Sequence, residues 1–231
     1  MRAPERGALP LGLAATLGRA YGRLTETVQG LSDADFARET RCPGMPVGPL
    51  LVHLLYDAER ALIAFASPAV ADPDRDFVTY WKDFPPGAGS DTSFVRGVAA
   101  SYRKPGVLVQ HWRELSEAAV RAAAAGLATK GHRVETQGHV LRARDFVATL
   151  VLEATVHHLD LIVGLPGAPE PDPEALQVTA RTLDGLFGPE AWDVIAWDTT
   201  TYVLKATGRV PLDEADHDML GPHADRLPLL G

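Results

Sequence analysis

The stretch that most constrains the fold of this chain is residues 146–165, FVATLVLEATVHHLDLIVGL. It is apolar around most of a helical circumference, and a helix of that kind is buried. Within it, Glu153, His157 and Asp160 stand at positions i, i+4 and i+7. At about 100° per residue they fall within roughly 60° of one another, on one stripe. A buried carboxylate is costly unless it is paired or bound to a metal. The pattern therefore predicts a helical core that contains a polar site.

The spacing of Glu153 and His157 points to a metal ion, because one ion can bind an oxygen and an imidazole nitrogen placed one helical turn apart. The alternative is an ordinary surface pair, since a Glu and a His four residues apart occur in many helices. A third ligand has to come from another helix, and helical geometry leaves His53 and His111 as competing candidates. His158 lies about 100° round from His157 and is not expected at the same site. The other histidines are predicted to lie in loops or in the tail, at the surface: His132, His139, His217 and His223.

Apolar residues at spacings of three and four predict further helices. The four long helices are expected over residues 9–31, 49–66, 93–125 and 142–163. A break is expected at Pro105, and Ser32 with Asp35 resembles a capping box before a short helical restart. Residues 133–141 alternate weakly and predict a short hairpin. Four long helices joined by loops of unequal length predict an all-α four-helix bundle.

The segments outside the helices carry two further expectations. Residues 67–91 are rich in Pro, Asp and Gly but also contain Phe77, Tyr80, Trp81 and Phe84. A loop of this length is either a lid over a functional site, in which Tyr80 and Trp81 would govern substrate affinity, or a plug packed onto the core. After the bundle, helical patterns at residues 173–186 and 189–207 precede an irregular tail. We therefore expect a bundle over residues 1–166 and a short, mainly helical extension over residues 167–231.

Composition excludes several classes of protein. The net charge of −8, with 30 acidic and 22 basic residues, argues against a nucleic-acid-binding surface. Cys42 is the only cysteine, which excludes an internal disulfide and a Cys-rich zinc module. No secretory signal and no uncharged apolar stretch of membrane-spanning length is visible, so no membrane association and a cytoplasmic location are expected. The preference for Arg over Lys, with abundant Ala, Gly and Pro, indicates a GC-rich bacterial genome.

Two motifs resemble those of a known family. CPGMPVGPLLVHLL at residues 42–55 and RDFVATLVLEATVHHLDL at residues 144–161 resemble the mycothiol-dependent maleylpyruvate isomerase family, part of the DinB-like metalloenzyme superfamily. The resemblance implies an up-and-down helical bundle in which His53, Glu153 and His157 bind the metal, and so favours His53 over His111. It also implies that Asp160 binds the thiol substrate or orients the site.

The resemblance further implies a function. We expect a divalent-metal-dependent enzyme, with zinc as the metal, that activates mycothiol for transfer to a small electrophile or for its cis–trans isomerisation. A metal-dependent hydrolase and a non-catalytic metal- or small-molecule-binding bundle are the alternatives. The expected partners are the thiol and the electrophile, and the protein is expected to be an actinobacterial monomer or homodimer. This chain departs from many relatives in having Met45 in place of Trp, Leu150 in place of Arg, and a short C-terminal region, so its substrate is expected to differ.

Overall fold

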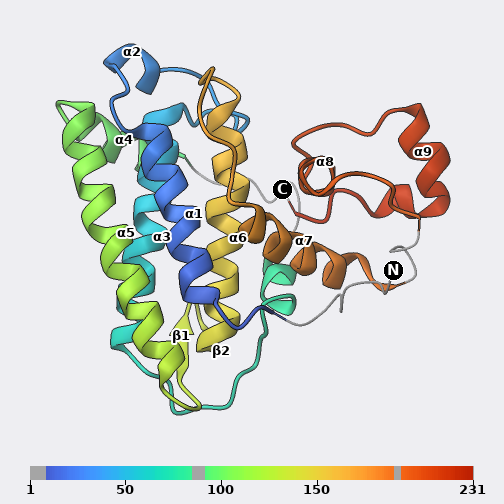
Figure 1. Ribbon diagram of the computed structural model, residues 1–231, viewed down its shortest axis with the longest axis horizontal. Coiled ribbons are helices and arrows are strands. Elements are labelled where there is room, and N and C mark those ends of the chain that lie inside the picture. Colours follow the sequence, from blue (N-terminus) through green and yellow to red (C-terminus); the bar gives the residue numbers. More distant parts are fainter. Residues whose placement is uncertain (1–8, 85–91, 190–193, 231) are drawn as a thin grey trace.

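The computed structural model describes residues 9–84, 92–189 and 194–230 (Figure 1). The end of the predicted loop (85–91) and residues 190–193 of the last predicted helix lie outside the described residues. Four long helices form the main body: α1 (Leu13–Val28), α3 (Val47–Ala66), α5 (Pro105–Ala128) and α6 (Ala143–Ile162). Both α1 and α3 pack against α5 and α6, so the four helices enclose one core. The predicted all-α bundle is confirmed.

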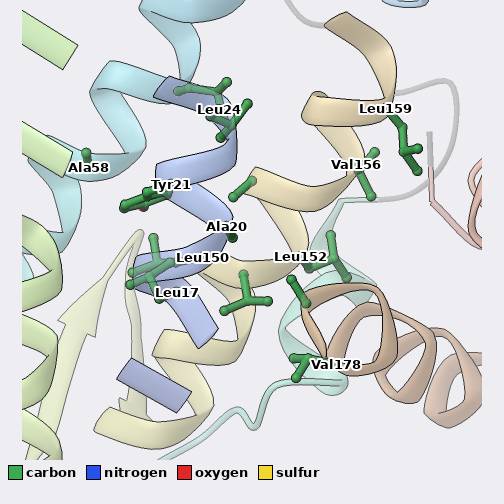
Figure 2. Packing of buried hydrophobic residues seen from close by; sticks show 14 of the residues in the cluster. Leu17, Ala20, Tyr21, Leu24, Ala58, Leu150, Leu152, Val156, Leu159 and Val178 are labelled. Atoms are coloured by element: carbon green, nitrogen blue, oxygen red, sulfur yellow. The ribbon is translucent and has the colours of Figure 1, made fainter. Parts of the chain in front are cut away.

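The core forms because the apolar residues of each helix recur at helical spacing. Along α1, residues of this kind are buried at 3% exposure or less: Leu13, Leu17, Ala20, Tyr21, Leu24 and Val28. They gather with residues of α6 and α7, as Figure 2 shows for Leu17, Leu150 and Val178. Nearly every residue of α6 is buried, including His157, His158 and Asp160. The polar groups of this helix must therefore be satisfied inside the protein.

Local signals explain where the helices begin. The predicted capping box is present, with Ser32 and Asp35 bonded reciprocally at the start of α2 (Asp33–Phe36). The predicted break separates α4 (Ser93–Ser101) from α5, which begins at Pro105. The predicted hairpin is also present, as β1 (Arg133–Thr136) paired antiparallel with β2 (His139–Arg142).

The bundle does not alternate strictly up and down, because α3 and α5 run in the same direction (Figure 1). For α5 to run parallel to α3, the connection after α3 must return along the whole length of that helix. A 20-residue helix is only about 30 Å long, and an extended segment spans that distance in about ten residues. Part of the connection is a short 3₁₀ helix, η1 (Thr79–Asp83), in which Tyr80 and Trp81 are 5% and 7% exposed. These two aromatic side chains pack onto the core, which supports the plug interpretation over the lid.

The C-terminal extension lies on one side of the bundle, beyond α6 (Figure 1). It contains α7 (Pro173–Phe187), α8 (Thr199–Ala206), α9 (Glu214–Leu220) and the 3₁₀ helix η3 (Gly221–Arg226). Of these, α7 packs directly on α6 and α1. The prediction of an irregular tail was wrong, because Asp213 and Asp216 form a capping box that starts α9. Among the described residues, no helix is both long and apolar enough to cross a bilayer.

Candidate metal centre

Three predicted ligands converge where α3 and α6 pack together. His53 comes from α3, and Glu153 and His157 come from successive turns of α6. One ligand atom from each lies within 4.8 Å of the other two. Glu153 Oε2 is 3.1 Å from His157 Nε2 and 3.6 Å from His53 Nε2. The competing candidate, His111, is exposed on α5, where its Nδ1 is 2.7 Å from the hydroxyl of Tyr102.

Two polar atoms at this point lack a hydrogen-bond partner within the described part of the chain. His53 Nε2 and Asp57 Oδ2 are buried without a hydrogen bond, and they lie 3.5 Å apart. Buried polar atoms of this kind are rare in proteins unless they bind a ligand, an ion or water. Two imidazole nitrogens and a carboxylate are a donor set that zinc takes in catalytic sites. The residues present therefore fit a divalent metal ion.

Glu153 is suited to serve as an anionic donor. Burial opposes its ionisation, but the adjacent imidazoles of His157 and His53 lower the pKa of Glu153 below its usual range. Asp57 differs, because burial raises its pKa and the charge of His53 only partly opposes this. Its other oxygen, Oδ1, accepts a hydrogen bond from Arg60 at 2.7 Å.

A second layer of residues holds His157 in place. Its Nδ1 lies 3.0 Å from Asp160 Oδ2, and Asp160 is fully buried. With Nδ1 directed at Asp160, the other ring nitrogen, Nε2, faces Glu153 and His53, which is the arrangement of histidines that bind metals through Nε2. Cys42 donates to Asp160 from Sγ at 3.0 Å, and Arg209 donates from two nitrogens at 3.3 Å. Burial opposes ionisation of Asp160, yet its bond with His157 and the charge of Arg209 lower its pKa to about 2.

Sequence reasoning missed three of these neighbours. The composition argument uses Cys42 only to exclude a disulfide and a Cys-rich zinc module, although the residue lies in the same motif as His53. Arg209 follows α8 in the extension, and helical spacing carries no signal for a contact with a residue 49 positions away. Asp57 stands four residues after His53 on α3, so its shared helical face was visible in the sequence.

His158 lies outside the candidate metal centre, as predicted. It faces α1, where its Nε2 is 2.8 Å from Thr27 Oγ1, and it is 1% exposed. Burial lowers the pKa of His158 to about 4. The residue is therefore neutral in the folded protein near pH 6, where an exposed histidine would be partly charged.

We expect His158 to make the protein sensitive to acid. Its pKa is lower in the folded state than the unfolded value of 6.5, so its contribution to stability is fully present above about pH 6.5 and is lost as the pH falls toward 4. The difference corresponds to about 3 kcal/mol. Urea denaturation of wild type and His158→Gln from pH 7 to pH 4, with chelator present, measures it. Equal pH dependence of the two proteins would contradict the assignment.

The fold and the site together define the class of this protein, a DinB-like helical bundle with a His–Glu–His cluster between two helices. The family described as the mycothiol maleylpyruvate isomerase N-terminal domain matches residues 17–162, and the chain belongs to this family.

Solved structures share the fold. A crystal structure of mycothiol-dependent maleylpyruvate isomerase is similar at 18% identity, with a TM-score of 0.50, over 80% of this chain and 72% of that one. A histidine-to-alanine mutant of mycothiol-dependent maleylpyruvate isomerase is similar at 17% identity with the same TM-score and coverage. No curated protein matches the chain. At these identities the two structures establish the DinB-like fold.

Proposed function

We propose that this chain is a divalent-metal-dependent enzyme that activates mycothiol for transfer to a small electrophile, or for its cis–trans isomerisation. The observation that carries the proposal is the convergence of His53, Glu153 and His157 around a buried nitrogen, His53 Nε2, that has no hydrogen bond among the described residues. Membership of the mycothiol maleylpyruvate isomerase N-terminal domain family supports mycothiol as the thiol. Mycothiol is an actinobacterial thiol, so the same proposal places the protein in the actinobacterial cytoplasm.

Each residue of the site has a separate role in this proposal. His53, Glu153 and His157 would hold the ion, and three protein ligands leave a coordination position for a substrate. A bound divalent ion such as Zn²⁺ lowers the pKa of a thiol, so that a thiolate nucleophile exists at neutral pH. Asp160 would accept a hydrogen bond from the Nδ1–H group of His157 and so direct Nε2 toward the ion. Arg209 and Cys42 keep Asp160 in that position.

Metal removal tests this function. Dialysis against a chelator should lower mycothiol-dependent turnover of a small electrophile at least about 100-fold, since the ion supplies the activation of the thiol. Addition of one equivalent of Zn²⁺ should restore it. Metal-dependent turnover that does not require the thiol would instead identify a hydrolase. Turnover that persists without metal would contradict the proposal.

A further inference from the structure

A cavity of about 390 Å³ opens beside the candidate metal centre, between α3 and α4. It is lined by His53, Tyr56, Glu59, Arg60, Ile63, Phe94 and Val95. His53 belongs both to this lining and to the candidate metal centre, so a molecule in the cavity lies next to the candidate ligands. The volume is within the range of small-molecule sites.

The walls of the cavity are mainly apolar. The rings of Tyr56 and Phe94 lie 5.5 Å apart at a tilt of 38°, and Ile63 and Val95 add aliphatic surface. Phe94 is 62% exposed and Ile63 60% exposed, which leaves two large apolar side chains open to water. An apolar molecule that covers them removes this surface from water, which favours its binding.

The charges at the cavity do not favour an anionic ligand. Among the described lining residues, Arg60 carries the one guanidinium or ammonium group, and it donates to Asp57 at 2.7 Å. The amide of Gln137, with its oxygen turned toward Arg60, accepts from the same guanidinium at 3.1–3.2 Å. Glu59 adds a carboxylate to the lining, and Asp57 and Glu153 lie close to His53. Arg60 is therefore already paired with Asp57 and Gln137, and no unpaired guanidinium or ammonium among the described lining residues is left for an acidic substrate.

We infer that this cavity binds the apolar, uncharged part of the electrophile, and that the substrate is a neutral molecule with an aryl or alkyl group rather than a dicarboxylate. The inference rests on the proposed function and adds the substrate class to it. A substrate carboxylate in this cavity would lose water without gaining a cationic partner, which is unfavourable. An apolar substrate group would cover apolar side chains that are otherwise exposed to water, which is favourable. In the transfer reaction, the thiol sulfur forms a bond to the electrophilic carbon. The bond from that carbon to the leaving group breaks, the electron pair leaves with that group, and the thiol proton passes to water.

A matched pair of electrophiles tests the substrate class. Methyl 4-chloro-3,5-dinitrobenzoate and 4-chloro-3,5-dinitrobenzoate differ in one group, a neutral methyl ester or an ionised carboxylate, and both release chloride when mycothiol attacks the carbon that bears it. With each kcat/KM divided by the uncatalysed rate constant, the metal-loaded enzyme should prefer the ester at least about 10-fold, which corresponds to 1.4 kcal/mol. Equal or better turnover of the carboxylate would overturn the inference.

A variant with a positive charge in the cavity wall tests whether the cavity sets the preference for the ester. Phe94→Lys should lower the preference for the ester about 10-fold, because the new ammonium pairs with the carboxylate and the apolar wall is lost. Val107→Lys is the control: it introduces the same positive charge at a residue of α5 that is 58% exposed and does not line the cavity. It should leave the preference unchanged. A similar change in both variants would show that overall charge, rather than the cavity, sets the preference.

Calorimetry separates this inference from the proposed function. Methyl 3,5-dinitrobenzoate and 3,5-dinitrobenzoate lack the leaving group, so their binding to metal-loaded protein does not depend on catalysis. The ester should bind at least about 10-fold more tightly, and Phe94→Lys should weaken its binding. Binding of the ester without turnover of its chlorinated form would contradict the proposed function and support the cavity assignment. Failure of the ester to bind, or tighter binding of the carboxylate, would overturn the cavity assignment.

Discussion

Alanine at His53, Glu153 or His157 is expected to remove the metal from the purified protein, from close to one ion per chain to less than about one tenth. Each change removes one of the three converging ligand atoms. Loss of a residue that only hydrogen-bonds to a metal ligand lowers metal affinity roughly 10- to 100-fold, so loss of a ligand itself should lower it further. Mycothiol-dependent turnover should disappear with the metal. Inductively coupled plasma mass spectrometry after purification without chelator measures the metal content directly.

His111→Ala is the matched control for these ligand variants. It removes the other histidine that helical geometry offered as a ligand, and in the structure this residue contacts Tyr102 on the outside of α5. The variant should keep its metal and its turnover. Full metal content in the His53 variant, together with loss in the His111 variant, would place the site elsewhere.

Asp160→Ala is expected to have two separate effects. Metal affinity or turnover should fall by about 10- to 100-fold, because His157 loses the acceptor that orients its ring. Stability should fall by about 3–5 kcal/mol, because the guanidinium of Arg209 is left without its buried partner. Zinc titration, turnover and urea denaturation of the metal-free protein measure these effects independently.

Two further variants separate the effects of Asp160. Asp160→Ala combined with Arg209→Leu should recover much of the stability, since no charge is left unpaired, but should not recover the metal affinity. Asp216→Ala removes another buried carboxylate, the partner of Lys205 in the extension, and should lower stability without changing metal binding. An Asp160 variant with wild-type turnover and metal affinity would exclude the orienting role.

The helices of the bundle could be predicted because their apolar residues repeat with the period of the α-helix. The same period placed Glu153, His157 and Asp160 on one stripe of α6, and short-range signals located the capping box at Ser32 and the break at Pro105. These features depend on residues close together in the chain, so local geometry is sufficient to predict them.

Other features depend on contacts between distant residues. Helical spacing could not choose between His53 and His111, and the packing of α3 on α6 places His53 beside Glu153. The local sequence pattern also could not show that Trp81 packs onto the core. An aromatic residue in a long loop is compatible with a lid as well as with a plug.

The amino-acid sequence by itself determined the helical class of this protein and the stripe of ionisable groups on its buried helix, because both follow from the 3.6-residue repeat. The tertiary structure alone decided which side chains surround Asp160. Cys42 precedes α3 and Arg209 follows α8, yet both reach Asp160. A buried carboxylate needs partners, and the packing of α3, α6 and the extension determines which side chains provide them.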